Sequence, residues 1–79
     1  MSPTVFRHRH YRFFFFSREE SRAHVHISCP DGHAKFWLEP IVSLAHFHGL
    51  QARVLRKLQV VVEERHGEIF RAWKKHFER

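Results

Sequence analysis

The 79-residue chain is long enough for a single domain, 1–79, and too short for two, and its one cysteine, Cys29, excludes an internal disulfide. A lone cysteine and the lack of a leader or of an apolar run long enough to cross a bilayer lead us to expect a cytoplasmic protein with no membrane partner. The net charge of +6 favours anionic partners. A domain of this size buries little surface, so either a partner or a well-packed core must stabilise it.

Residues 1–39 have the pattern of two β-hairpins. Four runs rich in β-branched and aromatic residues are expected to be strands, at 4–8, 11–17, 24–27 and 34–38. The first hairpin joins at Arg9-His10. A tight two-residue turn needs positive φ at its central residues, which glycine or asparagine adopts most easily, so this turn is either longer than two residues or strained. The second hairpin turns at 29–33, which contains Pro, Asp and Gly.

Residues 40–79 have a helical pattern. Pro40 suits the first position of a short helix that Gly49 would end, with four residues on one face, at Ile41, Leu44, Ala45 and His48. A long helix is expected from about Ala52, although Gln51 is not a preferred N-cap residue. Its apolar stripe predicts a core-facing side, with a kink or break near Gly67. The fold class is therefore α+β: an antiparallel sheet of about four strands, a short helix and a long C-terminal helix.

The run Phe13–Phe16 predicts a strand that is apolar on both faces. Successive strand residues point to opposite sides, so Phe14 and Phe16 lie opposite Phe13 and Phe15. The helices can cover one side only. A second helix, a neighbouring chain or a partner protein must cover the other, because a large apolar patch rarely stays exposed, and of these we expect self-association or a small cognate protein. The residues expected to anchor this interface are Phe14, Phe16, Trp37 and Trp73, of which Trp73 serves equally well as a core residue.

Several motifs in order resemble the small bacterial proteins of domain of unknown function family 4160. They are Thr4-Val5-Phe6-Arg7, Tyr11-Arg12-Phe13-Phe14-Phe15-Phe16-Ser17, His24-Val25-His26, Ala34-Lys35-Phe36-Trp37-Leu38, Pro40, Gly49 and Trp73. Members of that family are often encoded beside another small protein, in pairs suspected of being toxin–antitoxin-like modules. The resemblance implies a protein partner, with nucleic acid as a further one, and it implies no catalytic residue.

His24 and His26 are the sharpest catalytic candidates. On a strand they face the same side, about 6.6 Å apart along the backbone. Such a pair can act as general base and general acid on RNA, with Lys35 stabilising the charge of the transition state and no metal required. The alternative is a surface strand whose histidines contact neighbours or a partner, and we expect binding rather than catalysis.

No metal or other cofactor is expected. His24 and His26 with a third imidazole from His33, His8 or His10 make the nearest candidate set, but structural zinc usually takes four ligands. Cys29 has no companion cysteine. If 40–49 is helical, His46 and His48 diverge by about 200° and cannot chelate together.

Basic residues interleaved with aromatic ones suggest a nucleic-acid surface. The residues expected to contribute are Arg9, Tyr11, Arg12 and Lys35 from the strands and Arg53, Arg56 and Lys57 from the long helix. A solvated helix face explains the second group equally well. The nine histidines would add positive charge on mild acidification, which should tighten binding to any polyanion.

The sequence thus predicts an interaction component of a toxin–antitoxin-like two-gene module, which binds a small cognate protein, with nucleic acid as a further candidate partner. The first alternative is a small metal-independent ribonuclease that uses His24, His26 and Lys35. The second is a homodimeric structural domain without catalysis.

Overall fold

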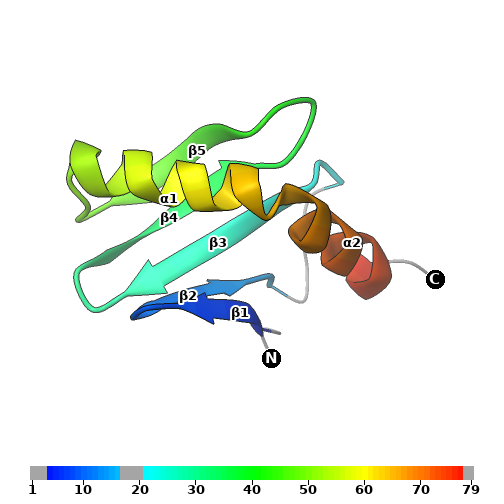
Figure 1. Ribbon diagram of the computed structural model, residues 1–79, viewed down its shortest axis with the longest axis horizontal. Coiled ribbons are helices and arrows are strands. Elements are labelled where there is room, and N and C mark those ends of the chain that lie inside the picture. The colour runs from blue at the N-terminus through cyan, green and yellow to red at the C-terminus, as the bar shows by residue number, and fades with distance from the viewer. Residues whose placement is uncertain (1–3, 17–20, 78–79) are drawn as a thin grey trace.

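The computed structural model describes residues 4–16 and 21–77. Within these ranges the chain forms β1 (Thr4–His8), β2 (Tyr11–Phe14), β3 (His24–Cys29), β4 (Gly32–Trp37), β5 (Ser43–His48), α1 (Ala52–Glu64) and α2 (His66–Phe77). The five strands are antiparallel and lie in chain order, so each strand pairs with the next one along the sequence (Figure 1). The chain is α+β, as the sequence predicts, with five strands rather than about four.

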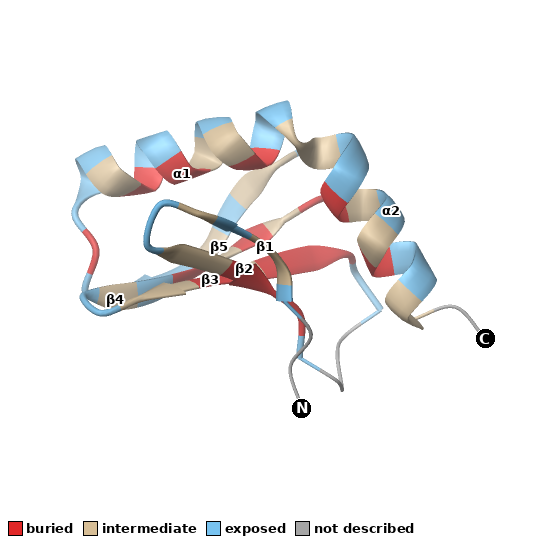
Figure 2. Ribbon diagram, turned by 60° about the horizontal axis from the view of Figure 1, so that its bottom comes forward, coloured by how far each residue is buried: buried red, intermediate tan, exposed pale blue. Residues whose placement is uncertain are grey.

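The two helices pack against one face of the sheet, so the molecule has two layers (Figure 2). Alternate strand residues supply the sheet half of the core, including Phe13, Val25, Ile27, Ala34 and Phe36. The apolar stripe of the helices supplies the other half, with Leu55, Leu58, Val62, Ile69 and Trp73. The expected alternation of the phenylalanine run is confirmed on this side, because Phe13 and Phe15 are only 0% and 2% exposed.

The short helix expected after Pro40 is wrong, because this segment forms the edge strand β5. Lys35 pairs with His46 but Phe36 pairs with Leu44, so Ala45 is an extra residue in a β-bulge. The bulge leaves Leu44 and Phe47 opposite residues of the helix-covered face of β4. The bulge breaks the alternation expected of a strand, so the residues expected on one face of a helix had a misleading spacing.

The long C-terminal helix is confirmed, and it divides into α1 and α2 at Arg65. The Arg65 guanidinium lies 3.5 Å from the centre of the Phe6 ring and forms a salt bridge of 2.9 Å to Glu68. His66 donates a 2.7 Å hydrogen bond from Nε2 to the carbonyl oxygen of Leu38, just past β4. These contacts join the break between the helices to both halves of the sheet. Neither helix of the described residues is long and apolar enough to span a membrane.

Three tight turns lie at the same end of the sheet. Arg9 in the β1–β2 turn has a φ of 57°, so the expected strain in this join is present. Gly49 after β5 has a φ of 76°, and a Cβ atom there would collide with the backbone oxygen of Asp31. A Cβ atom on Gly32 would collide with the backbone oxygen of His48. The β3–β4 and β5–α1 turns therefore pack in direct backbone contact.

Candidate functional site

The face of the sheet that the helices leave uncovered, here called the outer face, carries two complete rows of side chains. Cross-strand partners point to the same side of a sheet, so the pairing registers define these rows. The first row crosses all five strands through Arg7, Arg12, Ser28, His33 and His48. The second row crosses all five strands through Thr4, Phe14, His26, Lys35 and His46. These two rows bring together cations, imidazoles and one aromatic ring.

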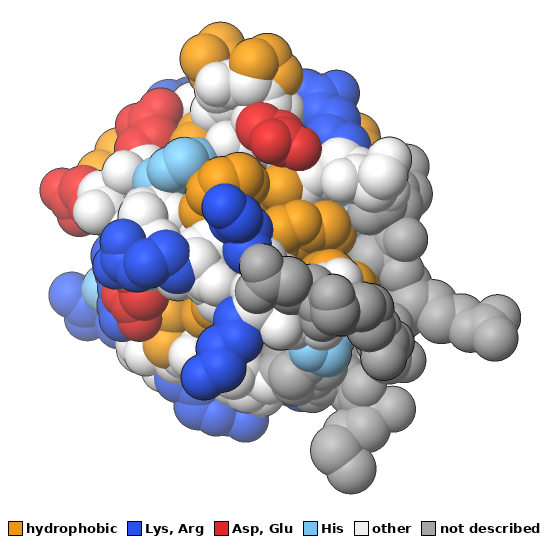
Figure 3. All heavy atoms as spheres, turned by 90° about the vertical axis from the view of Figure 1, so that its right-hand side faces the viewer, with side chains coloured by type: hydrophobic (Ala, Val, Ile, Leu, Met, Phe, Trp, Pro, Cys, Tyr) orange, Lys and Arg blue, Asp and Glu red, His pale blue; other side chains and the backbone are white. Residues whose placement is uncertain are grey.

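The described strands give the outer face positively charged side chains and no negatively charged ones. None of the residues in β1 to β5 is Asp or Glu, while Arg7, Arg12 and Lys35 all lie on the outer face. The end of the molecule formed by α2 differs, because basic and acidic side chains are interspersed there (Figure 3). Of the described surfaces, the outer face is therefore suited to attract an anionic partner by long-range electrostatics.

A hollow of about 550 Å³ lies at the centre of the outer face. It is lined by Phe14, Phe16, His26, Ile27, Ser28, His33, Ala34, Lys35 and His46. Most of its wall is carbon, and the polar groups at its centre are His26 and Lys35, which pair across β3 and β4. A shallow apolar hollow with a few convergent polar groups is typical of a binding site.

The chain itself covers part of the apolar surface on this face. Phe14 is 8% exposed, because the Arg12 guanidinium lies 4.5 Å from its ring centre and the His26 and Phe16 rings lie 5.5 and 5.2 Å away. Phe16 remains 45% exposed. The sequence predicted that both Phe14 and Phe16 would be covered by a partner. In the structure only Phe16 and the hollow beside it present apolar surface for a partner to cover.

His24 and His26 come together as expected, with ring centres 5.0 Å apart. Their surroundings differ, however. His24 is 0% exposed and packs 5.0 Å from the Trp73 ring, and its Nδ1 donates a 2.7 Å hydrogen bond to the carbonyl oxygen of Arg22. His26 is partly exposed and lines the hollow. His24 is thus a buried packing residue, whereas His26 is accessible to a ligand in the hollow.

Lys35 and Trp37 form a cationic and aromatic group next to His26. The Lys35 ammonium lies 4.5 Å from the Trp37 ring centre and the Arg22 guanidinium lies 4.1 Å from it. Each of these contacts is a cation–π interaction. The indole therefore contacts two cations, of which the Lys35 ammonium also lies in the wall of the hollow.

Three histidines gather at the open edge of the outer face. The His33 ring lies 5.5 Å from the His46 ring and 5.7 Å from the His48 ring. The expectation that His46 and His48 diverge is wrong, because it assumed a helix; on β5 they are two residues apart and face the same side. Sequence reasoning missed this group, since only the pairing of β4 with β5 brings His33 to the other two.

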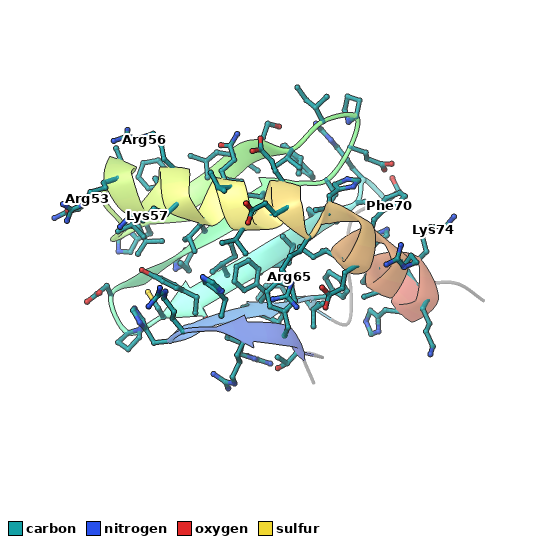
Figure 4. The ribbon with its side chains drawn as sticks, viewed as in Figure 1. Arg53, Arg56, Lys57, Arg65, Phe70 and Lys74 are labelled. Atoms are coloured by element: carbon teal, nitrogen blue, oxygen red, sulfur yellow. The ribbon has the colours of Figure 1, made fainter. Side chains whose placement is uncertain are left out.

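The residues expected to bind nucleic acid lie on two sides of the molecule. Arg12 and Lys35 are on the outer face, whereas Tyr11 lies on the helix-covered face and Arg9 in the β1–β2 turn. The second group is exposed at the N-terminal end of α1, in the opposite layer, as Figure 4 shows for Arg53, Arg56 and Lys57. The fold therefore does not assemble these residues into one continuous surface.

The expected interface anchors are also divided. Phe14, Phe16 and Trp37 lie on or beside the outer face. Trp73 is only 7% exposed and packs inside the chain against Phe15, at 5.6 Å between ring centres. Trp73 is therefore a core residue, which was one of the two roles expected for it.

The histidine set considered for a metal does not assemble. Among the described residues, neither His24 nor His26 belongs to a group of three close metal-ligating side chains, and neither do His33 and His8. His10 does belong to such a group, with different companions.

The comparison with known proteins identifies a family. The model of a family described as a domain of unknown function (DUF4160) matches residues 11–74, which is most of the chain. This match confirms the resemblance found in the sequence. No curated protein and no solved structure matches the chain.

Proposed function

The chain belongs to the DUF4160 family, and we propose that it is the interaction component of a toxin–antitoxin-like two-gene module that binds a small cognate protein through the outer face. The observation that carries this proposal is the hollow beside Phe16, set in a sheet face that no described helix covers and whose strands contain cations but no Asp or Glu. The two-gene arrangement is what resemblance to the family implies.

Charge indicates the kind of partner segment. With Arg7, Arg12 and Lys35 on this face and no carboxylate in any strand, an acidic segment gains attraction and a basic one is repelled. The apolar hollow adds a place for one large apolar side chain to anchor. An acidic strand or helix with one aromatic or aliphatic residue is therefore the partner that fits, because interface affinity concentrates in such buried anchors.

Co-expression with the product of the adjacent gene tests the proposal. We expect a complex that co-purifies, and Lys35→Glu should weaken its affinity at least about tenfold, because it places a negative charge opposite an acidic segment. Lys57→Glu is the matched control, since Lys57 is an exposed lysine on α1 in the other layer. It should change the affinity by less than about threefold.

The proposal fails if the two proteins do not associate, or if both substitutions weaken binding equally. A chain that forms only a dimer with itself, and binds no product of the adjacent gene, would favour the homodimeric structural domain instead.

A second candidate is the metal-independent ribonuclease, favoured by the position of Lys35 between two imidazoles. His26 and His46 pair with Lys35 from opposite sides, through β3 and β5. In that mechanism His26 takes the proton of a ribose 2′-hydroxyl, the 2′-oxygen bonds to phosphorus, and the 5′-oxygen leaves with a proton from a second imidazole. Lys35 stabilises the phosphorane-like charge. His24 would support His26 from the interior, and His46 is the exposed imidazole on the other side.

Cleavage of RNA in the presence of EDTA tests the second candidate. A ribonuclease should cut RNA and lose at least about a hundredfold in rate with His26→Ala. The matched control His8→Ala, on the helix-covered side of β1, should keep its rate. If the purified chain leaves RNA intact, binding alone is its activity.

A further inference from the structure

Three side chains with different donor atoms meet at the end of the sheet, away from the hollow of the outer face. His10 lies in the β1–β2 turn, Cys29 ends β3, and Asp31 lies in the β3–β4 turn. One ligand atom of each lies within 4.8 Å of those of the other two. They form the only group of three such close side chains among the described His, Cys, Asp and Glu residues.

The donor set has the chemistry of a site for a late first-row divalent metal. An imidazole nitrogen, a thiolate sulfur and a carboxylate oxygen are the three ligand types that Zn²⁺ takes in proteins. In a tetrahedral zinc site the ligand atoms lie about 3.5 Å apart, given metal–ligand bonds of about 2.0 to 2.3 Å. His10 and Asp31 are exposed and Cys29 is partly exposed, so rotation of surface side chains can close the remaining distance.

The backbone that carries these ligands is held in place. Asp31 sits in the turn that packs against Gly49, with no space for a Cβ atom between them. A hollow of about 410 Å³ beside Asp31, lined by Tyr11 and the start of α1, leaves room for solvent.

We propose that His10, Cys29 and Asp31 bind one zinc ion, with water in the fourth position. Metal binding here joins the first hairpin to the second, in a chain that has no disulfide to do so. The thiol must lose its proton and the imidazole must be neutral for coordination, so zinc binding releases protons and weakens as the pH falls. The site is separate from the outer face, and its existence does not depend on the proposed partner.

Cobalt titration of the full chain tests the site, because Co²⁺ replaces Zn²⁺ and gives visible and near-ultraviolet bands that report its ligands. We expect one Co²⁺ per chain, a thiolate-to-cobalt charge-transfer band, and loss of both on addition of Zn²⁺. Cys29→Ser should remove the charge-transfer band, and His10→Gln should weaken Zn²⁺ affinity at least about tenfold.

The matched control is His33→Gln, which removes an exposed histidine from the outer face. It should leave Zn²⁺ affinity within about twofold of the original. Far-ultraviolet circular dichroism establishes whether each variant folds. If Cys29→Ser does not fold, the Zn²⁺ affinity of His10→Gln, whose substitution lies in an exposed turn, tests the site. A titration of the original chain without a charge-transfer band overturns the proposal, as does an equal loss of affinity in His33→Gln and His10→Gln.

Discussion

His26 on β3 and Lys35 on β4 are direct cross-strand partners, and both face away from the helices into the central hollow of the outer face. Phe14 continues this row on one side and His46 on the other. The centre of the uncovered sheet face is thus positively charged and bordered by aromatic rings, and the proposed binding function depends on this arrangement.

The affinity for an acidic partner should rise on mild acidification. Imidazoles gain a positive charge as the pH falls from 7.5 to 6, whereas partner carboxylates stay ionised in that interval, so attraction grows. We expect affinity to increase at least about threefold, as measured by calorimetry at several pH values. An affinity that is independent of pH in the original chain would count against the electrostatic account.

Phe16 should act as a binding anchor and not as a stability determinant. It is 45% exposed beside the hollow, and Val60 on α1 is comparably exposed at 49%. Phe16→Ser should weaken partner binding at least about tenfold, since aromatic residues often dominate interface energetics, and should change unfolding free energy by no more than about 1 kcal/mol. Val60→Ser is the control and should leave partner affinity unchanged; equal effects on affinity would argue against the outer face.

Trp73 should contribute to the stability of the isolated chain. It is 7% exposed and packs against Phe15 and His24. Trp73→Ala should lower the free energy of unfolding in urea by about 3 to 5 kcal/mol, the usual cost of truncating a buried tryptophan. The neighbouring Lys74→Ala, at an exposed position, should change it by less than about 0.5 kcal/mol. An unaltered urea midpoint for Trp73→Ala would mean that the indole is not part of the core.

Two glycine substitutions should have opposite effects on stability. A Cβ atom at Gly32 collides with the backbone oxygen of His48, so Gly32→Ala should cost about 2 kcal/mol or more of unfolding free energy. At Gly67 the nearest atom to a Cβ is Nη1 of Arg71, 3.3 Å away at the end of a flexible side chain. Gly67→Ala should therefore stabilise α2 by roughly 0.5 to 1 kcal/mol. Urea denaturation measures both, and a neutral Gly32→Ala would show that the turns can separate freely.

The sequence predicted the first four strands and the long helix because each has a regular pattern. Alternation placed Phe13 and Phe15 in the core, and a stripe of period 3.6 marked the buried side of α1 and α2. The second strand is shorter than expected, because β2 ends at Phe14, and Phe15 and Phe16 follow it outside any strand; the expected end at Ser17 lies outside the described residues. β5 was not predicted, because the bulge at Ala45 interrupts the alternation of its inward and outward side chains.

The candidate site was predictable only where it lies within one strand. Strand geometry alone placed His24 and His26 on the same face, but it could not show that His24 is buried beneath Trp73. The pairing of His33 with His48 and the meeting of His10 with Cys29 depend on register and on where turns converge. Register and turn convergence are long-range properties, and a local sequence pattern does not predict them.

The most direct test of the central claim is a titration of ¹⁵N-labelled protein with the product of the adjacent gene, followed by amide chemical shifts. We expect the largest shift changes at His26, Lys35 and His46 on the outer face, with little change at Arg53 and Lys57 on α1. Shift changes confined to α1, or none at any partner concentration, would contradict it.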